Sequence, residues 1–285
     1  MTWVAWRQHS REAALASGIL VLLAAYLAFE WGQMSSAFSQ LGLGSCQDNI
    51  VGTACGNALN SFQSFYPMSV TVRYMLTALP ALLGVFVAAP LLPREVEHGT
   101  HMFIWTQSIT RTRWFTIKVV LLVSFTLVAA AALAATVTWW HRPLDVMYPD
   151  GAWTFFDVIG PVPVAYAFFA LALGLAVGIV VPRTVPAMAA TLLLFVATRV
   201  AISLWRPWFL APITTHLPAS GDTLSSLRGA LQIVQPNYSS TLQTVVVYQP
   251  ADRFWTFQAI ETGMFLLLAV VLISLSAWWL RHRIH

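Results

Sequence analysis

The chain has 285 residues, of which 58% are apolar and 9% are charged, and its formal net charge is +4. Because soluble domains carry roughly 25% charged residues, this composition excludes a soluble globular protein and indicates an integral membrane protein. The positive charge reflects an uneven distribution of basic residues across the membrane and does not indicate a nucleic-acid partner.

Six segments are apolar and long enough to cross a bilayer as helices, which takes about 20 residues each. They cover residues 13–31, 70–92, 117–140, 160–181, 185–205 and 257–280. These runs lack the alternation of apolar and polar residues that marks a membrane β-strand. We therefore predict an all-α membrane protein with six transmembrane helices in a single domain, residues 1–285.

Basic residues are concentrated on one side of this six-span arrangement. With the N-terminus inside, the cytosolic segments hold Arg7, Arg11, Arg94, Arg111, Arg113, Lys118, Arg183, Arg281 and Arg283. The aspartates all fall on the opposite side. Because short cytosolic loops carry the excess of lysine and arginine, both termini are predicted to be cytosolic.

The first residues are basic and aromatic, with Trp3 and Trp6 three positions apart. This spacing predicts an amphipathic helix in the cytosolic headgroup layer, although a frayed basic terminus would have the same composition. A signal peptide cleaved near residues 35–37 is a further alternative. The apolar run of about 19 residues is longer than the usual signal core of about 7–15, which favours a retained span.

Residues 32–69 form the first predicted extracytoplasmic loop and contain both cysteines of the chain, Cys46 and Cys55. A proximal pair outside the cell usually oxidises, so we predict a disulfide between them. The loop contains no histidine, which makes metal ligation by these cysteines improbable.

The segment at residues 94–116 is polar and lies between two long apolar runs. Gly99 permits a turn, Thr100 can cap a new helix, and Met102, Trp105 and Ile109 give that helix an apolar face. A short amphipathic helix tied to two spans would act as a lever for a soluble partner. An ordinary polar turn with interface aromatics is the alternative.

Two features of the later spans concern packing and charge. Gly174 and Gly178 form a G-x-x-x-G pattern, which permits close helix contact either within the chain or at a dimer seam. Arg199 lies inside the fifth span, and an intramembrane arginine needs a partner or water. We predict Glu261 as its partner, with Glu30 and Arg73 at similar depth, in a polar station that is either a structural ion pair or a gate.

Residues 206–256 form the second long extracytoplasmic loop. It is rich in proline and includes a β-prone stretch at residues 244–248. Together with residues 32–69 it is expected to form a small extracytoplasmic cap.

The chain resembles type-2 ATP-binding-cassette exporter permeases. Those permeases carry an acidic pair before Gly-Thr, a helix, a hydroxyl–Arg element and a Lys entering the third span. The matching residues here are Glu95, Glu97, Gly99, Thr100, Thr110, Arg111 and Lys118. Ser108 stands where the family often has proline, and residues 248–263 are similar to actinobacterial members.

The resemblance implies a coupling role for the cytosolic segment, with Glu95, Glu97, Gly99, Thr100, Trp105 and Arg111 facing a separate ATPase. It also implies two permease subunits, expected as a homodimer in a bacterial cell membrane, with two ATPase subunits that hold ATP and Mg. No G-x-x-x-x-G-K-[ST] string occurs in the chain, so it lacks the P-loop that cradles phosphates and is not expected to be an enzyme itself.

These observations predict an exporter subunit for an apolar or amphipathic substrate such as a drug, a lipid or a peptide. A stand-alone channel, a secondary transporter or a non-transporting sensor or anchor remains an alternative. His98 and His101 flank Gly99 but lack further spaced ligands, so no metal site is predicted, and no cofactor is expected in this chain.

Overall fold

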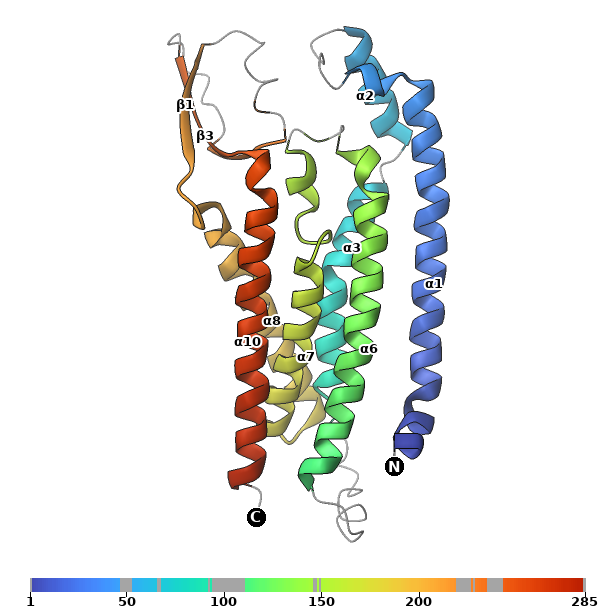
Figure 1. The fold of residues 1–285 in the computed structure, drawn as a ribbon, viewed down its shortest axis with the longest axis vertical. Coiled ribbons are helices and arrows are strands. Elements are labelled where there is room, and N and C mark those ends of the chain that lie inside the picture. Colours follow the sequence, from blue (N-terminus) through green and yellow to red (C-terminus); the bar gives the residue numbers. More distant parts are fainter. Residues whose placement is uncertain are drawn as a thin grey trace.

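The computed structural model describes residues 2–46, 53–65, 68–91, 93, 111–145, 148, 150–218, 227, 229–234 and 243–283. Within these residues, six helices are long and apolar enough to cross a membrane. The N-terminal end of the first and the C-terminal end of the last lie at the same end of the bundle, opposite a small β-sheet (Figure 1). The predicted fold class, an all-α membrane protein with six spans, is confirmed for this part of the chain.

The long helices are α1 (Thr2–Gln40), α3 (Met68–Leu83), α6 (Arg111–Trp140), α7 (Val162–Val180), α8 (Thr184–Trp205) and α10 (Phe254–Arg283). Apolar side chains such as Leu22, Val128 and Leu193 are exposed on their outer surfaces. Such an apolar surface suits lipid hydrocarbon rather than water.

The N-terminal region differs in one respect from the predicted spans. The helix α1 is continuous from Thr2 to Gln40, and the expected interfacial position of its first residues stays a prediction. The same helix extends beyond the predicted end of the first span, and α2 (Thr53–Phe65) follows after the 3₁₀ turn η1 (Leu43–Cys46). The first outer loop is therefore largely helical.

Helix α7 is the centre of the bundle. About 72% of its span is buried, against 11–33% for the other five spans. It packs against α3, α6, α8 and α10. Its small residues make this close packing possible, because Cβ atoms added at Gly174 and Gly178 would lie 2.5 Å from the Gly84 carbonyl oxygen and 2.7 Å from the Ala89 carbonyl oxygen.

The partner surface of these glycines is a distorted part of the second span. Pro80 lies inside α3, and the π-helical turn η2 (Gly84–Ala88) follows it. There the Ala89 amide donates a hydrogen bond to the Gly84 carbonyl, 2.9 Å away. The G-x-x-x-G pattern of α7 thus packs on this segment of the same chain.

The second outer loop holds a three-stranded antiparallel sheet made of β1 (Ile213–Pro218), β2 (Leu231–Val234) and β3 (Gln243–Gln249), with β3 in the middle. The stretch predicted to be β-prone is part of β3. Buried Gln249 connects the sheet to the end of α8, because its Nε2 donates to the carbonyls of Pro207 at 3.0 Å and Leu210 at 2.8 Å. The sheet lies above α10, whereas α2 lies near the end of α1 (Figure 1).

Candidate functional site

Five polar side chains meet where α7, α8 and α10 reach the end of the bundle that carries the sheet. We call this group the outer ion cluster, and it consists of Asp157, Tyr166, Arg199, Arg206 and Glu261. Tyr166 comes from α7, Arg199 from α8, Arg206 from the residue after α8, and Glu261 from α10. Asp157 comes from the loop between the 3₁₀ turn η4 (Gly151–Phe155) and α7.

The loop that carries Asp157 is fixed at both of its ends. Gly160 has a φ of +69°, and a Cβ atom there would lie 2.9 Å from Gln258 Oε1, so glycine is required. Gln258, on α10, donates through Nε2 to the Phe156 carbonyl at 2.8 Å and accepts from the Val162 amide at 3.3 Å. These bonds hold Asp157 against the helix ends.

Arg206 is the central cation of the outer ion cluster. Its Nε and Nη2 donate to the two oxygens of Glu261 at 2.8 and 3.0 Å, and Nη2 also donates to Asp157 Oδ1 at 2.6 Å. The Glu261 side chain is only 1% exposed and also accepts a hydrogen bond from the Tyr166 hydroxyl. This two-bond geometry matches the planar fork of arginine.

Arg199 is held less tightly than Arg206. Its Nη2 lies 3.4 Å from Asp157 Oδ1, and its guanidinium carbon lies 3.5 Å from the centre of the Tyr166 ring. Its Nη1 is buried and has no hydrogen-bond partner among the described residues. The ring face therefore provides much of its stabilisation, as a cation–π contact.

The outer ion cluster contains two guanidiniums and two carboxylates, so its formal charges balance. Burial alone would raise the pKa of Asp157, but the guanidiniums of Arg206 and Arg199 lower it below its usual value. Asp157 is therefore ionised at neutral pH. Its side chain is half-buried, and the two guanidiniums stabilise its charge in that position.

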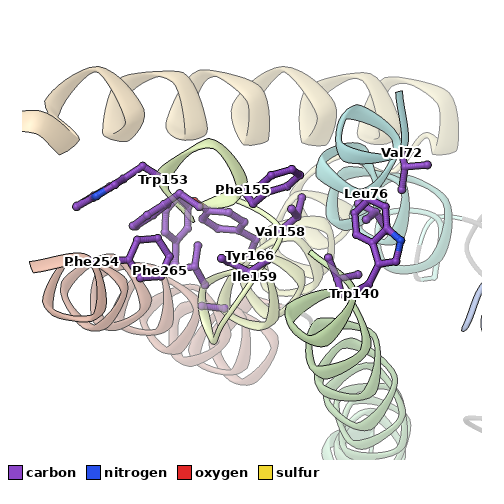
Figure 2. Close-up of a cluster of buried hydrophobic side chains, with 14 of the residues drawn as sticks. Val72, Leu76, Trp140, Trp153, Phe155, Val158, Ile159, Tyr166, Phe254 and Phe265 are labelled. Atoms are coloured by element: carbon purple, nitrogen blue, oxygen red, sulfur yellow. The ribbon is translucent and has the colours of Figure 1, made fainter. Parts of the chain in front are cut away.

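Aromatic rings surround the outer ion cluster on its buried side. The guanidinium carbon of Arg206 lies 4.1 Å from the centre of the Phe156 ring. Trp153 stacks on Phe156 with centroids 5.8 Å apart and meets the edges of Phe254 and Phe257 at 5.3 and 5.1 Å. Figure 2 shows Trp153, Phe254, Tyr166 and Phe265 gathered between the helices. The rings limit the access of water from within the bundle.

The predicted pairing of Arg199 with Glu261 is wrong, although both residues belong to the same cluster. The structure pairs Arg199 with Asp157 and Glu261 with Arg206. The reason is that the loop before α7 folds back and supplies a carboxylate that span prediction had assigned to the exterior. Arg206 lies seven residues after Arg199, two helical turns along the same face of α8, and that spacing was the available signal.

Glu30 and Arg73 do not join the outer ion cluster. Arg73, on α3, donates from Nη1 to the Thr154 carbonyl at 2.8 Å and lies over the Tyr74 ring. Glu30, on α1, is buried and interacts with Trp140 at the end of α6, and it makes none of the contacts of the outer ion cluster. Glu30 and Arg73 therefore do not share a site with Arg199 and Glu261, although the predicted spans place all four residues at similar depth.

The predicted coupling residues Glu95, Glu97, Gly99, Thr100 and Trp105 lie outside the described residues, as do His98 and His101. Arg111 is the first residue of α6, and its side chain is not described. The expected coupling role of this segment stays a prediction. No group of three or more metal-ligating side chains occurs in the part of the chain that the structure describes.

The predicted disulfide between Cys46 and Cys55 also stays a prediction. Cys55 lies on α2 and is not a free thiol. Cys46 ends η1, and its side chain lies outside the described part.

Six apolar helices in the described part of the chain, one of them buried at the centre of the bundle, define a multi-pass membrane protein with an ion cluster at one end. Residues 17–206, more than half of the chain, match the family model described as "ABC-2 membrane transporter related". The chain belongs to this family, which provides membrane subunits of ABC transporters. No curated protein and no solved structure matches the chain.

Proposed function

We propose that this chain is the permease subunit of an ATP-binding-cassette exporter. It moves an apolar or amphipathic substrate with energy from ATP, which is hydrolysed with Mg on a separate ATPase subunit. The observation that carries the proposal is the family match over residues 17–206, which covers five of the six spans and the segment between the second and third.

The outer ion cluster suits a transporter that alternates between two states. It joins α7, α8 and α10 at one end through several short contacts to a single residue, Arg206. Buried ion pairs are either fully made or broken at a cost of several kcal/mol, so they separate discrete states rather than a continuum of them. We propose that the cluster keeps this end of the bundle closed until the ATPase acts.

The force for opening would enter at the opposite end. Residues 94–110 connect the second span to α6. The second span packs on the central α7 through η2, and α6 packs on α7 directly. We propose that Glu95, Glu97, Gly99, Thr100, Trp105 and Arg111 contact the ATPase and pass its movement to these spans. The complex would hold two such permease chains, as a homodimer, and two ATPase subunits in a bacterial cell membrane.

Affinity purification of the tagged chain from its native membrane, followed by mass spectrometry, tests the proposal. We expect an ATP-binding-cassette ATPase in a one-to-one ratio with this chain, and we expect it to dissociate in Glu95→Arg. Glu12→Arg is the matched charge reversal, because Glu12 belongs to α1 and not to the predicted coupling segment. A chain that purifies without any nucleotide-binding protein would refute the exporter and favour a stand-alone channel or transporter.

A further inference from the structure

Four polar side chains in one short segment hold neighbouring parts of the outer end of the bundle. We call them the outer clasp, and they are Gln249, Arg253, Gln258 and Glu261. The segment begins at the last residue of β3, passes through the 3₁₀ turn η6 (Ala251–Arg253) and continues into α10, so it joins the sheet directly to the bundle (Figure 1). Only Pro250 separates the strand from the turn, and α10 follows the turn without a break. The connection between the sheet and α10 is therefore short and regular.

The first two side chains of the outer clasp hold the chain that leaves α8. Gln249 is fully buried, and its Nε2 donates to two carbonyls within residues 207–210, at 3.0 and 2.8 Å. Arg253 Nη1 donates to the Ala211 carbonyl at 2.8 Å and to Gln249 Oε1 at 3.0 Å. Because this stretch directly follows Arg206, the two side chains fix the backbone from which the central cation of the outer ion cluster extends.

The other two side chains lie one turn apart on α10. Gln258 is fully buried, donates to the Phe156 carbonyl at 2.8 Å and accepts from the Val162 amide at 3.3 Å. Glu261 follows at i+3 on the same face of the helix, and its two oxygens accept hydrogen bonds from Arg206 at 2.8 and 3.0 Å. The outer clasp therefore holds both the end of α8 and the loop before α7.

Apolar packing between α8 and α10 does not duplicate these polar contacts. Helix α10 packs along α7, and α8 packs on α7, α3 and η2, whereas α8 and α10 form no extensive contact with each other in the described structure. Phe169 of α7 contacts both helices, with its ring centroid 6.0 Å from that of Phe195 and 5.2 Å from that of Phe265. Separation of the outer ends of α8 and α10 would thus break mainly hydrogen bonds, which water can replace at a small net cost.

We propose that the outer clasp releases α8 and the loop before α7 in one step, so that the sheet and the outer ion cluster open and close as a unit. Loss of the Gln249 bonds frees the backbone after Arg206. The two-bond pairing of Arg206 with Glu261 tolerates little displacement, because the planar fork must stay aligned with the carboxylate. Loss of that pairing frees α10, which carries Gln258 and holds the loop through it. Opening of this end during export rests on the proposed function, whereas opening as one unit is a property of the chain alone.

Hydrogen–deuterium exchange of the purified full chain in dodecyl maltoside, measured by mass spectrometry, tests the proposal. In the loop before α7, the amides of Val158 and Ile159 donate to the Phe155 carbonyl, and β1 is paired with β3 in the sheet. Exchange of amides in both segments therefore requires local opening. Each segment is read in the variant that leaves its own hydrogen bonds in place.

We expect Gln249→Leu to accelerate exchange about tenfold in residues 156–160, to which Gln249 makes no hydrogen bond. Gln258→Leu should accelerate exchange by a similar factor in residues 213–217, to which Gln258 makes none, because a coupling between two sites is reciprocal. Gln33→Leu is the matched control and should leave exchange unchanged in both segments, because Gln33 is exposed on α1 and makes no contact of the outer clasp.

Acceleration confined to the segment that each glutamine contacts would overturn the proposal, because it would show that the contacts open independently. Acceleration of equal size in residues 19–29 of α1 would also overturn it, since the whole fold would then be loosened. If Gln249→Leu elutes as an aggregate in gel filtration, Arg253→Ala takes its place, with an expected acceleration of about threefold in residues 156–160 and the same grounds for rejection. No ATPase is present in any arm, so a negative result leaves the exporter proposal standing, and failure of the exporter proposal leaves this result intact.

Discussion

Removal of the Arg206 side chain tests the arrangement of the outer ion cluster. Arg206→Ala deletes both hydrogen bonds to Glu261 and the 2.6 Å bond to Asp157. Glu261 is then left at 1% exposure with only the Tyr166 hydroxyl as a partner. Breaking a buried ion pair from one side costs about 3–5 kcal/mol, and we expect a loss of unfolding free energy in that range.

Companion variants separate the charge from the packing. Glu261→Gln in the Arg206→Ala background removes the uncompensated charge and should recover part of the loss. Arg199→Ala should cost less than Arg206→Ala, because Arg199 makes one ion contact at 3.4 Å and retains an unpartnered Nη1. Arg183→Ala, at the exposed opposite end of α8, should change stability by less than about 0.5 kcal/mol.

The assay is reversible unfolding in mixed detergent micelles at pH 7, with far-ultraviolet circular dichroism and tryptophan fluorescence as two probes. The reasoning would be refuted if Arg206→Ala stayed within about 1 kcal/mol of wild type. It would also be refuted if Arg199→Ala proved the more damaging of the two substitutions.

Three further predictions concern pH, packing and the outer cysteines. The arginine partners of Asp157 lower the pKa of its carboxyl group in the folded protein. The stability that these ion pairs contribute is therefore complete above the usual carboxyl pKa of 3.8, and it is lost as the pH falls through the lower pKa of the folded state. The stability difference between wild type and Asp157→Asn should therefore shrink between pH 5 and pH 2, and a constant difference would contradict the pairing. Gly174→Ala places a Cβ atom 2.5 Å from a backbone oxygen and should lower the free energy of unfolding by about 1–3 kcal/mol. At Gly263 an added Cβ atom meets no atom within 4 Å, so Gly263→Ala should leave that free energy unchanged or raise it by up to about 1 kcal/mol. Equal effects of the two substitutions would argue against close packing at α7. Peptide mapping without reductant should recover Cys46 and Cys55 in one linked fragment, and alkylation of both thiols before reduction would disprove the disulfide.

Hydrophobic length was sufficient to place the central helices. The helices α7, α8 and α10 begin and end within three residues of the predicted spans, because burial in the bilayer or in the bundle favours the same apolar residues. The extension of α1 to Gln40 was missed because the added turns are polar. There Ser36 and Ser39 donate to the carbonyls of Gln33 and Ser36, both at 2.8 Å, which satisfies their hydroxyls within the helix.

The candidate site was predicted only in part. An arginine inside a span requires a partner, and this rule correctly marked Arg199 as part of a polar cluster. The identity of the partner depended on the loop before α7, whose path is set by the positive φ of Gly160 and by Gln258 on α10. The length of the spans and the side of the membrane on which charged residues fall do not predict a turn of this kind or a contact between distant segments.

The position of Glu30 outside the outer ion cluster was likewise not visible in the sequence. Glu30 and Arg73 were expected to join the polar station of Arg199 and Glu261 because they lie at similar depth in their spans. In the structure Arg73 is directed to the Thr154 carbonyl, and Glu30 faces the end of α6. Depth in the membrane is readable from sequence, whereas position around the bundle depends on packing.

ATP hydrolysis by the reconstituted complex tests the central claim most directly. The chain and its copurifying ATPase would be placed in liposomes, and hydrolysis compared between wild type and Gly99→Trp, with gel filtration and circular dichroism to verify assembly and fold. The account predicts that wild type hydrolyses ATP and that Gly99→Trp abolishes coupled hydrolysis while the fold stays intact. Hydrolysis at the wild-type rate in Gly99→Trp, or a chain that brings no ATPase with it, would contradict the account.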